Sequence, residues 1–263
     1  MVFNHLGLFE GIGGFSLAAH WMGWETKAWC EINPFGQQVL RYHFPKAEAF
    51  FDIKQSNFEK YKGTIDILTG GFPCQPYSSA GKRLGRDDER HLWPEMLRAI
   101  REIQPRWIVG ENVLGLVNWD GGLVFHEVQT DLEAAGYEVF SYVLPACAVN
   151  APHKRDRVWF VAYSAANRLQ IIDKEFGQVN RIFKETSTGF CFNSFASWSS
   201  SKRGAGMVCD GDGLSCELDG ITFSKWRKES IKAYGNAIVP QVALQIFKAI
   251  EEYETQGLPR NRH

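Results

Sequence analysis

Cys74 lies in a setting that is unusual for a core cysteine, between Pro73 and Gln75. A core cysteine usually has apolar neighbours, whereas this one is flanked by a stiff residue and a polar residue. It follows a short apolar run, 66–69, which predicts a buried strand and places Cys74 at the carboxyl edge of a sheet. Basic residues nearby, such as Lys82, favour the thiolate, which is the nucleophilic form of cysteine. From this motif alone, a nucleophile and a structural cysteine are equally good interpretations.

An acid and two arginines accompany other predicted strands. Glu111 closely follows the strand expected at 107–109, so its carboxyl group can face the same cleft as Cys74. Arg155 and Arg157 lead into a strand, and their spacing of two predicts that both guanidinium groups point to one face. Arginine is suited to binding phosphate and carbonyl groups. An ordinary salt-bridged strand start explains the same pair of arginines.

The stretch 9–14 carries three glycines between a predicted strand and a predicted helix. Such a turn lets the backbone approach a cofactor closely. Glu31 lies twenty residues after Gly11, at the end of the next predicted strand, where an acid suits the hydroxyl groups of a ribose. Ser16 stands where the dinucleotide fingerprint requires glycine, so a nicotinamide cofactor is not supported. Glycine-rich turns are common, however, and Glu31 is also compatible with a plain surface acid.

The elements that would hold these residues alternate between strands and helices over the first two thirds of the chain, which is typical of an α/β sheet. We expect strands at 4–9, 27–30, 66–69, 107–109, 138–144 and 158–163. We expect helices at 15–22 and 34–43, through 96–103 and 125–135, and at 242–253. Ordered structure is expected to return at 231, and 234–240 is expected to form a turn before the last helix, although a simple helix entry explains this segment equally.

The composition changes near residue 164. Residues 164–229 are rich in serine, glycine, asparagine and lysine and contain few long apolar runs. We therefore expect a catalytic and cofactor-binding domain at 1–163, a small irregular lobe at 164–229 and a C-terminal segment at 230–263 that returns to the first domain. A disordered linker is the alternative for the lobe, but its aromatic residues argue for some packing.

The 263 residues carry a formal net charge of −1, which is a mild argument against a nucleic-acid partner. Basic residues nevertheless gather beside the motifs, and Lys202 and Arg203 form one such cluster in the lobe. Since no run of eighteen apolar residues and no signal peptide is recognised, we expect a cytoplasmic protein without a membrane partner. The six cysteines show no C-x-x-C spacing, so no structural metal site is indicated.

These segments, in this order, resemble the motifs of DNA cytosine-5 methyltransferases of bacterial and phage type. The resemblance covers residues 5–163 and 233–250, and its specific motifs are Pro73-Cys74-Gln75, Glu111-Asn112-Val113 and Arg155-x-Arg157. It implies a Rossmann-like sheet that binds S-adenosylmethionine and releases S-adenosylhomocysteine. The implied reaction transfers a methyl group to C5 of a cytosine that is flipped out of double-stranded DNA.

The resemblance implies catalytic roles for four residues. Cys74 attacks C6 of the cytosine, a protonated Glu111 donates to N3, and Arg157 holds O2 with support from Arg155. The residues expected at the methyl-donor site are Phe9, Gly11, Ile12, Gly13, Gly14, Glu31, Ile32, Asp52, Ile53, Pro73, Leu92, Asn236 and Ala237. The residues expected to contact DNA are Gln75, Ser78, Lys82, Arg90, Lys202 and Arg203.

Two features depart from the family pattern. His153 stands where glutamine is common, and no arginine-rich segment precedes the last motif. The alternatives are a relative that methylates cytosine in transfer RNA and a non-catalytic nucleic-acid-binding module that keeps the fold. For the main interpretation we expect a monomer, with a cognate restriction endonuclease as a further partner.

Overall fold

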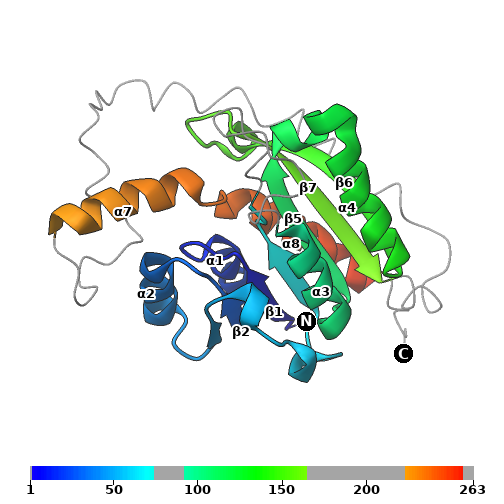
Figure 1. Cartoon of the computed structure of the whole chain (residues 1–263), viewed down its shortest axis with the longest axis horizontal. Coiled ribbons are helices and arrows are strands. Elements are labelled where there is room, and N and C mark those ends of the chain that lie inside the picture. Colours follow the sequence, from blue (N-terminus) through cyan, green and yellow to red (C-terminus); the bar gives the residue numbers. More distant parts are fainter. Residues whose placement is uncertain (1, 74–91, 165–222, 257–263) are drawn as a thin grey trace.

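A seven-stranded sheet of order β3-β2-β1-β4-β5-β7-β6 forms the centre of the computed structural model, which describes residues 2–73, 92–164 and 223–256 (Figure 1). Strands β3, β2, β1, β4 and β5 are parallel to one another, whereas β7 is antiparallel to both of its neighbours, β5 and β6. The strands are β1 (Asn4–Leu8), β2 (Glu25–Cys30), β3 (Glu48–Phe50), β4 (Ile67–Gly70), β5 (Trp107–Val113), β6 (Tyr137–Pro145) and β7 (Asp156–Ser164). The expected Rossmann-like α/β class is confirmed.

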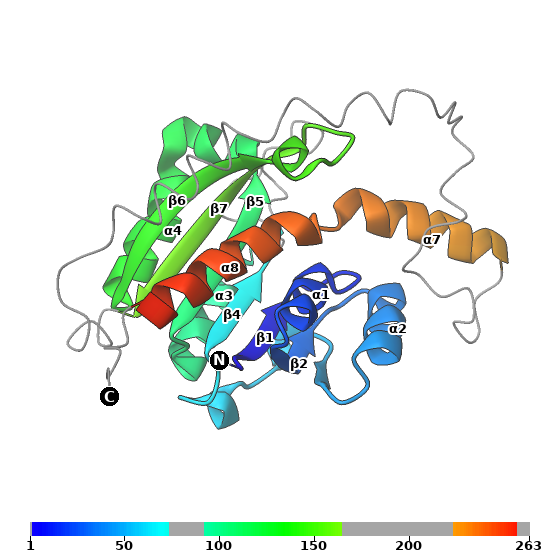
Figure 2. The same ribbon diagram turned by 180° about the vertical axis from the view of Figure 1, so that it is seen from behind.

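Helices cover both faces of the sheet, as parallel strands require, because their crossover connections must lie on the faces. Helices α3 and α4 lie on one face, and α1 and α8 lie on the other (Figures 1 and 2). The helices are α1 (Gly14–Trp21), α2 (Pro34–His43), α3 (Trp93–Ile103), α4 (Leu123–Ala134), α7 (Phe223–Asn236) and α8 (Pro240–Gln256). Short 3₁₀-helices include η1 (Ile53–Gln55), η2 (Glu59–Tyr61) and η6 (Ala146–Val149).

Two apolar clusters fill the space between the sheet and these two helix layers. Strand β7 contributes to both, because Phe160 faces α3 and α4, whereas Trp159 and Val161 face α1 and α8. This alternation is the period of two that a strand with both faces covered must show. Each such side chain stabilises the fold by about 1.5–3 kcal/mol relative to an exposed one. The sheet is therefore a rigid platform for the segments that leave its carboxyl edge.

Most expected elements are confirmed, but the C-terminal part differs. Residues 234–236 belong to α7 rather than to a turn, and α7 begins at Phe223, before the expected return of order at 231. Trp226 of α7 packs against Phe35 and Val39 of α2, and this contact stabilises a helix whose sequence is poor in apolar residues. Residues 165–222, most of the expected lobe, lie outside the described residues. In the described ranges, no helix is long and apolar enough to cross a membrane.

Candidate functional site

The carboxyl ends of β1, β4 and β5 bring three of the predicted motifs together. Leu8 pairs with Gly70, and Gly70 pairs with Gly110, so the glycine-rich turn and the segment before Cys74 leave the sheet at the edge where Glu111 continues β5. A Cβ atom added to Gly71 would lie 3.5 Å from Oε2 of Glu111, which places this carboxyl group directly beside the backbone that leads to Cys74. Cys74 itself lies outside the described residues.

Glu111 forms an ion pair with Arg157 across the β5–β7 ladder. The distance from Arg157 Nε to Glu111 Oε1 is 3.0 Å, and the Glu111 residue is 9% exposed. Burial raises the pKa of Glu111, and the neighbouring Arg157 and Arg155 oppose this rise without cancelling it. At a given pH the Glu111 carboxyl group is therefore more often protonated than that of an ordinary glutamate, and it lies next to the charged guanidinium group of Arg157.

Arg155 does not share the conformation of Arg157. Its φ angle is +41°, and β7 begins only at Asp156, so the period of two does not apply at Arg155, although Arg155 and Arg157 both oppose the rise in the pKa of Glu111. The Arg155 guanidinium turns instead to the junction of α7 and α8, where Nη1 donates to the carbonyl of Gly235 at 2.9 Å and Nη2 to that of Ala237 at 2.7 Å. In this structure Arg155 therefore fastens the C-terminal segment to the sheet edge.

The α7–α8 junction also touches the glycine-rich turn. A Cβ atom added to Gly14 would lie only 2.6 Å from Cγ1 of Ile238, so the absence of a side chain at Gly14 allows this close approach. The same isoleucine lies 4.0 Å from the Cβ position of Gly71. The expected donor-site residues Asn236 and Ala237 thus belong to a segment packed against the turn, although they lie far away in the sequence.

Glu31 holds the glycine-rich turn and the start of α2. Its Oε2 accepts a hydrogen bond from the Gly11 amide at 2.6 Å, and its Oε1 accepts one from Asn33 at 2.7 Å. Burial raises the pKa of Glu31, whereas these amide contacts act in the opposite direction. Each carboxylate oxygen has a second lone pair, so Glu31 can still accept from two hydroxyl groups.

These surroundings fit the nucleoside part of S-adenosylmethionine. Gly11 has a φ of +60°, and a Cβ atom there would have no atom within 4 Å, so the space above the turn is open. Ile32, next to Glu31, is 69% exposed and offers an apolar surface to a base. Such a ligand needs an acid that accepts hydrogen bonds from its ribose hydroxyls, an apolar surface beside its base, and a backbone that it can approach without meeting side chains.

Asp52 and Ile53 stand at the neighbouring strand end. The amide of Glu31 donates to the Phe50 carbonyl at 3.0 Å, which links the ends of β2 and β3. The Asp52 carboxylate caps η1 by accepting from the Lys54 amide at 3.0 Å. Strand β3 was not predicted, although it is the element that brings Asp52 to the same edge as Glu31.

Further predicted donor-site residues lie in the glycine-rich turn and beside β4 and α3. Leu92 precedes α3 as its N-cap residue, and Pro73 ends the described segment after β4. Phe9 adopts a left-handed φ of +54° at the start of the turn. The predicted residues outside the described ranges are Cys74, Gln75, Ser78, Lys82, Arg90, Lys202 and Arg203.

Sequence reasoning missed the role of Glu10 beneath the turn. Its Oε1 accepts from the Ser16 hydroxyl at 2.9 Å and lies 4.0 Å from Nε2 of the buried His5. Its Oε2 has no hydrogen-bond partner among the described residues. A Cβ atom at Gly7 would lie 1.9 Å from Oε1, so the carboxyl group occupies the space that a side chain at Gly7 would need. A glycine inside a predicted strand is the signal that could have revealed this close approach.

We expect Glu10→Gln to change how stability depends on pH. Burial raises the pKa of Glu10 from 4.5 to about 8, so between these values the folded chain keeps a proton that the unfolded chain releases. The wild-type free energy of unfolding should therefore fall as pH rises, by ~2 kcal/mol between pH 6.5 and 8 from this group alone. His5 contributes mainly below this window and in the opposite direction, because burial lowers its pKa from 6.5 to about 3, and its contribution is the same in the wild type and the variant.

Denaturant unfolding at several pH values measures this effect. In Glu10→Gln the free energy of unfolding should fall less steeply with pH than in the wild type, whereas the exposed Glu59→Gln should leave the wild-type slope unchanged. Equal slopes for wild type and Glu10→Gln over this window would contradict the assignment of the buried proton to Glu10.

Comparison with known proteins agrees with this geometry. The model of the family described as C-5 cytosine-specific DNA methylase matches residues 3–194. The Type II methyltransferase M.Eco47II of Escherichia coli is 38% identical over 164 residues, which are 61% of this chain and 39% of that protein. M.AquIA of a Picosynechococcus species is 33% identical over 193 residues, covering 67% of this chain and 78% of that protein.

Among solved structures, a Spodoptera frugiperda DNMT2 mutant shares the fold with a TM-score of 0.62 at 17% identity, covering 94% of this chain and 99% of that chain. Several relatives are considerably longer than their matched parts. The chain spans between 37% and 52% of the length of M.Eco47II, M.PspPI and M.NgoMIV.

Proposed function

Because the chain belongs to the family of C-5 cytosine-specific DNA methylases, we propose that it transfers a methyl group from S-adenosylmethionine to C5 of cytosine in double-stranded DNA. The observation that carries the proposal is the ion pair of the buried Glu111 with Arg157, beside Gly71, which lies three residues before Cys74. A carboxyl group with a raised pKa and a fixed guanidinium are the partners that a cytosine ring needs when a thiolate adds to it.

In the proposed reaction, the Cys74 thiolate forms a bond to C6 of the cytosine, and the ring electrons make C5 nucleophilic. Glu111 donates its proton to N3, where negative charge would otherwise develop, and Arg157 donates hydrogen bonds to O2. S-adenosylmethionine supplies an electrophilic methyl group. Loss of the C5 proton to water or another base then returns electrons to the ring and expels Cys74 as a thiolate, and N3 returns its proton to Glu111. The cytosine must leave the duplex for these contacts, at a cost of a few kcal/mol.

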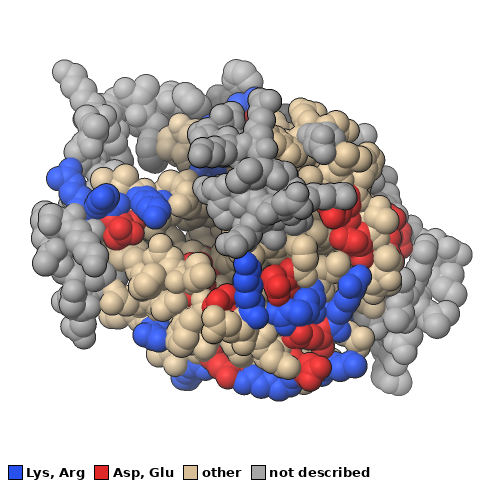
Figure 3. Space-filling view, viewed as in Figure 1, with Lys and Arg blue, Asp and Glu red and all other residues tan. Residues whose placement is uncertain are grey.

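Arg155 takes a supporting part in this scheme. Its contacts with Gly235 and Ala237 support a role in holding the α7–α8 junction against the donor turn. The exposed side chains of Arg227, Lys228 and Lys232 on α7 give this end of the molecule a basic surface, visible at the left of Figure 3. Such a surface favours the phosphates of DNA.

Recognition of the DNA sequence falls, in this proposal, to the lobe at 164–229, with Lys202 and Arg203 as phosphate contacts. The Type II relatives favour a cognate restriction endonuclease as the partner activity in the cell.

Methyl transfer from tritium-labelled S-adenosylmethionine tests the proposal directly. We expect label in double-stranded DNA, recovered as 5-methylcytosine after hydrolysis, and bisulfite sequencing of DNA from an expressing host should locate the modified sites. Label in transfer RNA but not in DNA would show that the substrate is RNA. No label in either, with S-adenosylmethionine bound, would favour a non-catalytic binding protein.

We expect Glu31→Ala to weaken binding of S-adenosylmethionine and S-adenosylhomocysteine by roughly 10–100-fold, because a hydrogen bond to a charged group contributes about 1.5–3 kcal/mol. The variant also releases the Gly11 amide from its acceptor. Isothermal calorimetry measures both affinities. Glu25→Ala, at an exposed position of β2, the strand that Glu31 follows, is the matched control. Unchanged affinity in Glu31→Ala would remove Glu31 from the donor site.

A further inference from the structure

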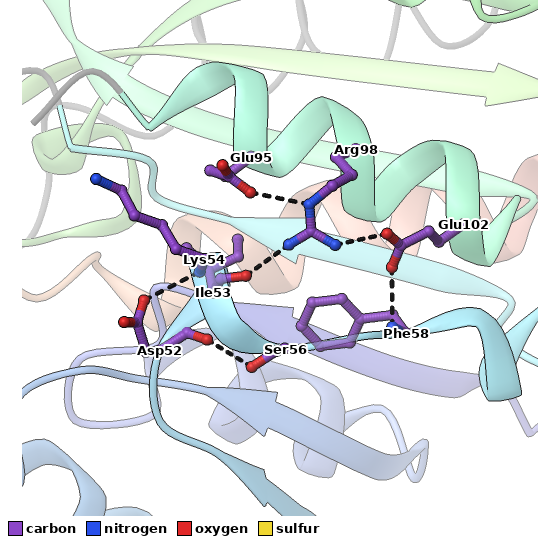
Figure 4. A network of polar contacts seen from close by, with 8 residues as sticks. All are labelled: Asp52, Ile53, Lys54, Ser56, Phe58, Glu95, Arg98 and Glu102. Atoms are coloured by element: carbon purple, nitrogen blue, oxygen red, sulfur yellow. Dashed lines mark hydrogen bonds and ion pairs between the residues drawn. The ribbon is translucent and has the colours of Figure 1, made fainter. Parts of the chain in front are cut away.

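Arg98, in the middle of α3, is the centre of a polar network that joins this helix to the segment after β3 (Figure 4). Its Nε donates to Glu95 at 2.9 Å and its Nη1 to Glu102 at 2.5 Å, both on the same helix. Its Nη2 donates to the backbone carbonyl of Ile53 at 2.5 Å. The two glutamates thus orient the guanidinium, and its remaining nitrogen reaches the neighbouring turn.

Glu102 makes a second connection to the same segment. Its Oε2 accepts from the Phe58 amide at 2.9 Å, so α3 holds the segment at both ends. Within the segment, the backbone carbonyl of Asp52 accepts a hydrogen bond from the Ser56 hydroxyl at 2.6 Å, and the Asp52 carboxylate accepts one from the Lys54 amide. The position of the Asp52 carboxylate is therefore determined by a turn that α3 anchors.

We propose that Arg98 is a positioning residue of the donor site, which holds the turn at Asp52 and Ile53 in the place where these two residues meet the adenine ring. The inference rests on the proposed function, in which this pair contacts the adenine. The Asp52 carboxylate can accept from the exocyclic amine of adenine but would repel the carbonyl oxygen at that position in hypoxanthine. Correct placement of the turn should therefore appear as a preference for adenine.

The Arg98 network is not needed to fill the core. The Arg98 side chain is 34% exposed and lines a surface groove together with acidic and basic side chains such as Glu59 and Lys62. Ion pairs in such surroundings contribute little to stability. In contrast, a displacement of about 1 Å in a group that positions a ligand can reduce the activity of the site by up to ~10²-fold. Loss of Arg98 should affect adenine recognition more than folding.

The test compares two ligands, S-adenosylhomocysteine and its hypoxanthine analogue S-inosylhomocysteine, by calorimetry. Wild type should prefer the adenosyl ligand. Arg98→Met should weaken adenosyl binding by roughly 10–100-fold and reduce the preference, with kcat at saturating donor within about threefold of wild type. Arg98→Lys should recover part of the affinity. Arg101→Met removes a neighbouring exposed charge from the same helix and the same surface groove, and it should leave both affinities unchanged.

Several outcomes would overturn the inference. If Arg98→Met binds both ligands with wild-type affinity and keeps the preference for adenine, the inference is wrong, while the proposed function stands. Equal weakening of both ligands together with a lower unfolding temperature would mean that Arg98 is merely structural. If Arg98→Met does not fold, Glu102→Gln should reduce the preference in the same direction, and an unchanged preference there would be equally decisive. Wild type that binds neither ligand would overturn the proposed function itself.

Discussion

Cys74→Ser should lose methyl transfer by roughly 10⁴-fold or more, because a hydroxyl at this position is not ionised near neutral pH and the covalent route is then closed. The substitution should leave donor binding intact, since Gly11 and Glu31 lie in the turns that follow β1 and β2, whereas Cys74 follows β4. Initial rates with labelled donor and calorimetry with S-adenosylhomocysteine measure the two properties separately.

A mechanism-based trap provides the direct evidence for the bond. DNA that carries 5-fluorocytosine cannot lose the C5 substituent as a proton, so the Cys74 adduct should persist through denaturing electrophoresis in the wild type. Cys147→Ser is the matched control, since Cys147 is a half-buried free thiol in η6, and this variant should still form the adduct. A stable adduct with Cys74→Ser would identify another nucleophile.

The sheet could be predicted because its strands are short apolar runs at regular spacing, and buried parallel strands have this character. Strand β3 escaped prediction since Glu48–Phe50 offers only three residues, one of them an exposed acid. Helix α7 escaped for a different reason. Its segment contains glycine and few apolar residues, and the helix depends on the packing of Trp226 against Phe35 and Val39, which is a tertiary contact.

The candidate site shows the same division. Glu31 and Glu111 could be located from sequence because they directly follow or end predicted strands, and the edge of the sheet then brings them together. The direction of the Arg155 side chain could not be located from sequence in this way. Its left-handed backbone conformation is uncommon for a residue other than glycine and accompanies its contacts with Gly235 and Ala237. Glu10 was missed because its burial requires the space that the absent side chain of Gly7 leaves free.

Glu111→Gln should reduce kcat by about 10²–10⁴-fold, the range that a positioned general acid contributes. Glutamine keeps an oxygen that can accept from Arg157 and nearly the same shape, so the fold and the donor affinity should be preserved. It cannot give up a proton to N3 of the cytosine. The effect should therefore appear in the chemical step and not in the affinity for S-adenosylhomocysteine.

The pH profile separates this role from a structural one. Because burial raises the pKa of Glu111, a larger fraction of wild-type molecules is protonated near neutral pH than for an ordinary glutamate, and kcat should fall as pH rises through that pKa. Glu111→Gln should lack this limb, whereas Glu133→Gln, at an exposed position of α4, should retain both the rate and the profile. A Glu111→Gln enzyme that keeps the wild-type rate and the same alkaline decline would exclude Glu111 as the proton donor and leave Arg157 as the group that stabilises the developing charge.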